Sequence, residues 1–267
     1  MKSVLGAWFT VLTASATAFG QTLDLTQYTI VDLTHPFNER TVFWPTATST
    51  FTLNREAWGE TPGGYFYSSF SFCTPEHGGT HLDAPLHFAE GGNSTSEVPL
   101  ERLIAPGVVI DVREQADAHR NYRLTRADVE AFERAHGRIA PGTIVLVRTG
   151  WSRFWPDRER YLGDATLGAD ARLSFPGLGE EATRLLVEER RAALLGIDTA
   201  SIDYGPSTDF IAHRIGAAQG VPNLENLTNL DRLPPRGATV IALPTKIEGG
   251  SGGPVRVIAL VPADRSP

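Results

Sequence analysis

Short runs of apolar residues, many of them branched at Cβ, recur from residue 108 onward. They cover residues 108–112, 143–149, 192–198, 239–243 and 255–261. Apolar residues are nearly continuous within each run and do not alternate with polar ones, which is typical of strands that are buried on both faces. The pattern therefore predicts five buried strands.

Two segments between these runs have the spacing of amphipathic helices. Residues 126–136 follow Thr125, a good N-cap residue, and place Val129 and Phe132 three positions apart on one side. Residues 179–191 carry apolar side chains on one side and charges elsewhere. Strands that alternate with helices indicate an α/β fold, and we expect a mixed sheet with flanking helices.

The first twenty residues differ from the rest of the chain. One early lysine precedes an uncharged run of apolar and small residues that ends in Ala18-Phe19-Gly20. This is the pattern of a secretory signal peptide, although a buried N-terminal helix or strand is the alternative. We expect residues 1–20 to be removed and residues 21–267 to form one domain of an exported protein, periplasmic in a Gram-negative source.

Composition narrows the possible partners. The net charge is −7, and no run of lysine or arginine stands out, so nucleic acid is not an expected partner. No apolar run after the signal segment is long enough to cross a membrane. Cys73 is the single cysteine and cannot form an internal disulfide. A soft metal ligand is conceivable there, but we expect a small buried side chain.

The segment EHGGTHLDAPLHF, residues 76–88, contains His77, His81, Asp83 and His87 within eleven positions. Histidines four apart can bind zinc from a helix, but the two glycines and Pro85 disfavour a helix here. In an extended segment, side chains two apart point the same way, so His81 and Asp83 should face one site. Imidazole and carboxylate together suit Zn²⁺ or Mn²⁺. Three histidines with separate hydrogen bonds are the alternative.

Signatures of other enzyme classes are absent from the sequence. We find no nucleophile elbow, no dinucleotide-binding glycine motif and no phosphate-binding P-loop. The glycine-rich residues 249–254 are expected to form a flexible turn between two strands. Ser152 has no evident base and is not expected to be a nucleophile.

The sequence resembles the cyclase-like metal-dependent hydrolases, a family that includes bacterial kynurenine formamidase and isatin hydrolase. The resemblance is carried by the motif H-x-G-T-H-x-D-x-P-x-H-F, which begins at His77 and ends at Phe88. It extends over nearly the whole chain after residue 20, through residues 31–37, 145–151, 194–203, 212–214, 224–231 and 242–260.

The resemblance implies a set of site residues. By position, His77, His81 and Asp83 would hold a first metal ion, His87 would be the general acid/base, His213 and Glu225 would complete a second metal position with Asp83, and Trp44 would contact the substrate ring. The implied cofactor is one or two divalent ions, manganese or zinc. The implied fold is a swivelling β/α/β domain, usually in an intertwined homodimer or a higher oligomer.

The substrate stays open between two amides. One is isatin, whose lactam would be opened to isatinate, and the other is N-formylkynurenine, which would yield kynurenine and formate. Export and the apparent insertion at residues 149–163 favour isatin, whereas Glu225 keeps a formamidase-like two-metal site possible. We expect an aromatic pocket around Trp44, with Tyr65, Phe66 and Phe70 as candidates. A non-catalytic periplasmic protein with a structural metal is the third reading.

Overall fold

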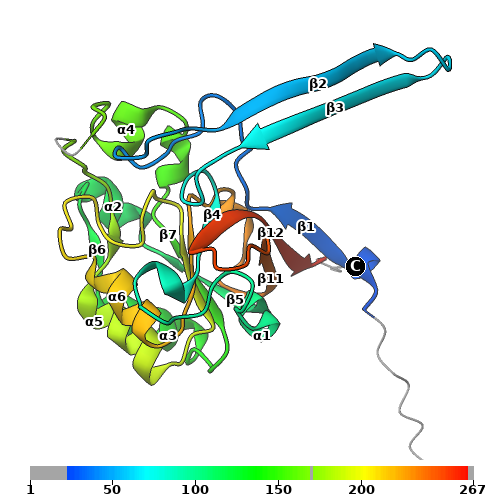
Figure 1. Cartoon of the computed structure of the whole chain (residues 1–267). Helices are drawn as coiled ribbons and strands as arrows, with labels where there is room; N and C mark the ends of the chain where they lie inside the picture. The colour runs from blue at the N-terminus through cyan, green and yellow to red at the C-terminus, as the bar shows by residue number, and fades with distance from the viewer. Residues whose placement is uncertain (1–22, 169–170, 264–267) are drawn as a thin grey trace, which may run out of the picture.

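The computed structural model describes residues 23–168 and 171–263, so the expected signal peptide lies outside the described residues. Its centre is an eight-stranded mixed sheet in the order β1-β12-β11-β5-β7-β9-β10-β4. Strands β5, β7, β9 and β10 run parallel, and the other pairs are antiparallel. Because β12 also pairs with β4, the sheet closes into a barrel-like ring (Figure 1).

The strands of this sheet include all five that the sequence predicts. Their bounds are β1 (Tyr28–Asp32), β4 (His81–Asp83), β5 (Ile104–Asp111), β7 (Ile144–Arg148), β9 (Leu194–Ile197), β10 (Asn223–Glu225), β11 (Arg236–Pro244) and β12 (Gly252–Pro262).

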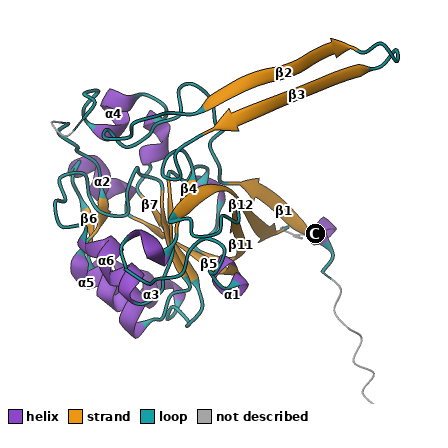
Figure 2. Cartoon of the chain, viewed as in Figure 1, coloured by secondary structure: helices purple, strands orange, loops and turns teal. Residues whose placement is uncertain are grey.

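Burial on both faces of the central strands has a simple cause. In β7, Ile144 and Leu146 point into the barrel and join one core cluster, while Val145 and Val147 point outward and join a second. The outer cluster is formed with helices α3 (Arg126–His136), α5 (Glu180–Arg184) and α6 (Ile211–Ala218), which cover the outside of the parallel strands (Figure 2). Continuous apolar runs are therefore required here, because each strand separates two cores.

The predicted helices are confirmed with one correction. Thr125 and Asp128 form a reciprocal capping box at the start of α3. The second helix is not a regular α-helix over 179–191, because α5 ends at Arg184 and the chain continues as a π-helical turn over Leu185–Glu189. The wider turn keeps three consecutive apolar side chains buried.

Shorter elements complete the described part of the chain. Three short helices are α1 (Leu100–Leu103), α2 (Arg113–Ala118) and α4 (Arg158–Leu162). A separate small parallel sheet is formed by β6 (Arg123–Leu124) and β8 (Gly177–Leu178). The segment at 149–163 contributes Trp151, Tyr161 and Leu162 to a third buried cluster, against which Trp44 packs. No helix among the described residues has the length and apolar character needed to cross a bilayer.

A long hairpin of β2 (Thr52–Glu60) and β3 (Phe66–Cys73) projects from the body of the molecule (Figure 1). Tyr65, Phe66 and Phe70 belong to this hairpin and are exposed, so the expectation that they line the pocket is wrong. Cys73 is also exposed, and the expectation of a small buried side chain is wrong as well.

Candidate metal centre

The site begins with the alternation of side chains on two paired strands. Leu82 of β4 and Leu224 of β10 are fully buried inside the barrel, so their neighbours along each strand point outward. The register places Glu225 directly opposite His81. His81, Asp83 and Glu225 therefore meet on the outer face of this strand pair, and the predicted common direction of His81 and Asp83 is confirmed.

The loop before β4 brings His77 to the same place. Gly79 has a left-handed backbone, with φ +58°, and a side chain there would collide with Phe37. Across the site, a side chain on Gly252 would collide with the ring of His77. Residues 249–254 are thus only partly the predicted turn, because Gly252–Pro254 belong to β12 and pair with β4. The glycines at both places allow backbone to approach the site closely.

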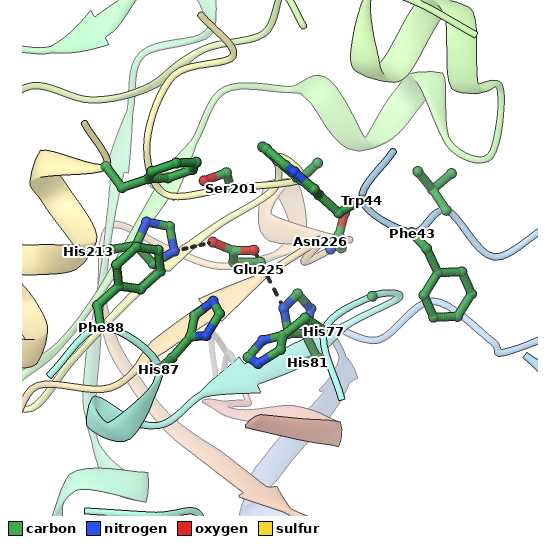
Figure 3. Close-up of a pocket in the computed structure, with 14 residues that line it drawn as sticks. Phe43, Trp44, His77, His81, His87, Phe88, Ser201, His213, Glu225 and Asn226 are labelled. Atoms are coloured by element: carbon green, nitrogen blue, oxygen red, sulfur yellow. Dashed lines mark hydrogen bonds and ion pairs between the residues drawn. The ribbon is translucent and has the colours of Figure 1, made fainter. Parts of the chain in front are cut away.

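Asp83 is the common contact of three histidines. Its Oδ1 lies 2.7 Å from His77 Nδ1 and 3.1 Å from His81 Nε2, and its Oδ2 lies 3.2 Å from His213 Nε2. Glu225 joins the same cluster, with Oε1 3.0 Å from His213 Nε2 and Oε2 3.5 Å from His81 Nε2 (Figure 3). The structure therefore brings together all five residues that the resemblance assigned to metal.

Each of these three histidines is also held on its other ring nitrogen. His81 Nδ1 donates to the Gly79 carbonyl at 3.0 Å, and His77 Nε2 lies 2.9 Å from the hydroxyl of Ser251. His213 Nδ1 lies 2.6 Å from Oδ2 of Asp203. Such contacts fix the ring plane and determine which nitrogen faces the cluster.

Buried charges dominate the electrostatics of the cluster. Burial opposes protonation of His81, but the neighbouring Asp83 and Glu225 outweigh it and raise its pKa to about 9. Burial likewise disfavours the ionised form of Asp83, yet His81 and the other histidines hold the pKa of this carboxyl well below its usual range. In the protein without metal, protons on imidazole balance the carboxylates.

The donor set fits a divalent cation. His81, Asp83 and Glu225 each offer an atom within 4.8 Å of the other two, and His77, Asp83 and His87 form a second such group. Among the described residues that line the pocket, none is a lysine or an arginine, so no side-chain cation other than histidine is available to pair with the carboxylates. Imidazole and carboxylate donors are those that Zn²⁺ and Mn²⁺ prefer.

His87 lies at the edge of this cluster. Its ring stacks on His77 with centroids 3.8 Å apart (Figure 3). One ring nitrogen of His87 and one carboxylate oxygen of Asp83 lie within 4.8 Å of each other. Burial is the main cause that lowers the pKa of His87 to about 4, and the neighbouring histidines act in the same direction. His87 is thus neutral at neutral pH and has a free lone pair.

An aromatic pocket of about 240 Å³ opens over the cluster. Its apolar walls are formed by Phe43, Trp44, Phe88 and Phe210, so Trp44 lies at a pocket, and its contact with a substrate ring stays a prediction. The rings of Trp44 and Phe210 lie with their centroids 6.2 Å apart. A flat apolar ligand that enters this pocket would reach the histidine and carboxylate cluster at its floor.

Sequence reasoning missed several residues of the site. Phe210 and Phe88 lie next to positions that the sequence does single out, since Phe88 ends the histidine motif and Phe210 precedes His213 by three. Asp203 follows the buried strand β9, and acidic residues beyond the carboxyl end of a parallel strand are a useful signal. Ser251 lay in a segment that we interpreted only as a turn.

The sequence is similar to those of known proteins over most of its length. The family described as "putative cyclase" matches residues 31–204. The isatin hydrolase of Roseibium aggregatum is 35% identical over 207 residues, which cover 74% of this chain and 77% of that protein. The kynurenine formamidase of Salinibacter ruber is 29% identical over 232 residues, which cover 86% of this chain and 96% of that protein.

The fold agrees with a solved structure as well. An isatin hydrolase bound to the product analogue thioisatinate has a TM-score of 0.80 and 29% sequence identity, and the match covers 89% of this chain and 94% of that one. The chain therefore shares its overall fold with this structure.

Proposed function

The chain belongs to the putative cyclase family and is a metal-dependent hydrolase of C–N bonds other than peptide bonds, and from this premise we propose that it opens the cyclic amide of isatin to isatinate. The alternative within the family is hydrolysis of N-formylkynurenine to kynurenine and formate. The reading as a non-catalytic binding protein is set aside, because the relatives are named as hydrolases.

The composition of the pocket wall carries the choice of substrate. Isatin is a compact, flat and uncharged bicycle, which suits aromatic walls and a volume of about 240 Å³. N-formylkynurenine carries an amino-acid end with a carboxylate and an ammonium group. Neither lysine nor arginine is found among the described lining residues to pair with that carboxylate. Glu225 favours the formamidase alternative only because it makes a second, formamidase-like metal position possible.

The proposed mechanism assigns separate tasks to the residues. A bound divalent cation would lower the pKa of water and polarise the amide carbonyl. The cation would be held by Asp83, by Glu225 and by the three histidines that contact these carboxylates. Trp44 and Phe210 orient the ring and exclude bulk water from the reacting bond.

His87 moves the protons. One of its ring nitrogens takes a proton from the attacking water as the oxygen bonds to the amide carbon, and later gives that proton to the leaving nitrogen as the C–N bond breaks. Its lowered pKa suits the first step, because the imidazole is neutral before the reaction. The leaving nitrogen becomes an amine on the aromatic ring of the product, and the former lactam carbonyl becomes a carboxylic acid that ionises by releasing the second proton of the water to solvent.

A metal-controlled panel tests the proposal. The purified protein is stripped with a chelator, reloaded with Zn²⁺ or Mn²⁺, and offered isatin, N-formylkynurenine and simple lactones. We expect isatin to be hydrolysed fastest, and only by the reloaded protein. Rapid turnover of N-formylkynurenine with inert isatin would overturn the choice of substrate. The panel also shows whether zinc or manganese restores the higher activity. Metal analysis of the reloaded protein counts the ions bound per chain and so distinguishes one ion from two.

We further propose a homodimer, on the evidence of the β2–β3 hairpin. Directly paired residues lie on the same face of a hairpin, so Leu53, Trp58, Phe66, Phe70 and Phe72 share one face, and all five are exposed. The opposite face carries small or polar residues such as Asn54 and Ser71. A two-stranded hairpin with an uncovered apolar face is marginal alone, and a second copy of the chain would cover it.

Light scattering on the purified protein tests this assembly. The double variant Trp58→Ser/Phe70→Ser should be monomeric, and Asn54→Ser on the polar face should leave the dimer intact. A monomeric parent protein would contradict the proposal. Export is a separate proposal, and N-terminal sequencing of the mature protein tests it, since retention of Met1 would exclude removal of residues 1–20.

A further inference from the structure

We propose that Asp203 is a positioning residue of the metal centre, which holds the ring of His213 so that Nε2 faces Asp83 and Glu225. The inference rests on the proposed function only in requiring that the cluster bind a metal ion. It does not depend on which amide is the substrate.

Asp203 holds His213 at two points, through its ring and through its backbone. Its Oδ2 accepts from both the ring Nδ1 of His213, at 2.6 Å, and the backbone N–H of His213, at 3.1 Å. Its Oδ1 accepts from the backbone N–H of Ala212 at 3.0 Å. Asp203 as a whole residue is 1% exposed. Ring and backbone of His213 are therefore tied to the same oxygen, which restricts rotation of the side chain.

The bond to Nδ1 determines what the other side of the ring can do. A carboxylate oxygen only accepts, so Nδ1 keeps its proton, and Nε2 offers its lone pair as the ligand atom once a cation displaces the second ring proton. Nε2 lies 3.2 Å from Asp83 Oδ2 and 3.0 Å from Glu225 Oε1, which are also acceptors. A cation held by Nε2 would take the place of that proton beside the two carboxylates.

Asp203 differs in this respect from the groups behind the other two histidines. His81 is held by a neutral carbonyl and His77 by a neutral hydroxyl, whereas His213 is held by a carboxylate. A carboxylate partner makes the stronger hydrogen bond and increases the basicity of the imidazole. His213 stands on helix α6, whereas His81, Asp83 and Glu225 stand on the barrel strands β4 and β10, so its position depends on such a clamp.

A purely structural role is the competing explanation, because the same carboxylate caps the first turn of α6. Asp198 offers a matched control. It is also 1% exposed and binds the backbone of Thr149 and Gly150, and it contacts none of the five candidate ligands. Loss of either aspartate removes a buried carboxylate that binds two backbone N–H groups.

The experiment measures metal binding in the full-length mature protein, without substrate. Zn²⁺ affinity is determined by competition with a chromophoric chelator for the parent protein, Asp203→Ala, Asp203→Asn and Asp198→Ala, at a temperature at which all remain folded by circular dichroism. We expect Asp203→Ala to weaken binding by about 10–100-fold, with Asp203→Asn intermediate. Asp198→Ala should bind Zn²⁺ within about 3-fold of the parent protein, because Asp198 binds the backbone of Thr149 and Gly150 and not a candidate ligand.

The results separate this inference from the choice of substrate. An Asp203→Ala variant with parental affinity, or one that loses no more affinity than Asp198→Ala, would overturn the inference and leave the isatin panel unaffected. If no amide in the panel is hydrolysed but Asp203→Ala selectively loses Zn²⁺ affinity, the inference stands and the proposed substrate fails. If Asp203→Ala does not fold, ¹⁵N NMR of the histidine rings in the zinc-loaded parent protein decides, since a proton on Nε2 of His213 would also overturn it.

Discussion

Replacing His87 with alanine removes an imidazole that stacks on His77 and lies at the edge of the metal cluster. The backbone of His87 belongs to a short 3-10 turn, Pro85–His87, which does not depend on the side chain. The variant should therefore fold normally. Its effect on the reaction separates two roles, because His87 is either the general acid/base or a further ligand.

The size of the effect follows from the surroundings of the ring. A general base contributes about 10²- to 10⁴-fold, most when its pKa lies near the working pH. Burial lowers the pKa of His87 to about 4, which makes it a weaker base than an imidazole poised near neutrality. We therefore expect the lower end of the range, a roughly 10²-fold fall in kcat, which corresponds to about 2.7 kcal/mol in the activation barrier.

The assay combines steady-state hydrolysis of isatin with metal analysis of the same sample. We expect parental metal content, a KM close to that of the parent protein, and the loss confined to kcat. In the parent protein, kcat should rise as pH increases through about 4 and stay level above it, because His87 must be neutral to accept a proton. A His87→Ala variant with parental kcat, or one that loses its metal, would refute the assignment.

Three further changes are predicted. Trp44→Ala should raise the KM for isatin roughly tenfold in steady-state kinetics with parental metal content, because an aromatic wall of the pocket is lost; an unchanged KM would remove Trp44 from substrate binding. Leu82→Ala should lower the free energy of unfolding by about 2–5 kcal/mol in urea denaturation, because Leu82 is fully buried inside the barrel; a loss under about 1 kcal/mol would contradict that packing. His35 stacks on Trp155, and burial lowers its pKa to about 4. Between pH 6.5 and 4 the unfolded chain therefore binds a proton at His35 that the folded protein does not bind, so the free energy of unfolding falls as pH drops. His35→Phe should reduce this slope by up to about 1.4 kcal/mol per pH unit, and a slope equal to that of the parent protein would show that His35 does not contribute.

Much of the fold could be predicted because its strands obey one local rule. A strand such as β7, with a barrel core on one side and helices on the other, must be apolar throughout, and this is visible in the sequence. The closure of the sheet into a ring could not be predicted from the sequence. It depends on β12 serving two neighbours along one edge, β4 near its start and β1 near its end, and no local pattern encodes such sharing.

The candidate site shows the same division between local and distant information. His77, His81, Asp83 and His87 lie close together in the sequence, and their spacing alone indicates a metal site. Asp203 has no such neighbours, and only the fold brings it to His213. The aromatic residues of the hairpin misled the prediction, because an exposed aromatic face and a pocket wall have the same composition.

Register connects the two halves of the site. His81 and Glu225 are 144 positions apart, and they face each other only because β4 and β10 pair in one register. A shift of one residue would turn Glu225 into the barrel and Leu224 out to the metal cluster. Burying Leu82 and Leu224 in the barrel core prevents this shift, because the alternative would place a carboxylate among apolar side chains. The hydrophobic core of the barrel thus fixes which oxygen and nitrogen atoms meet at the metal site.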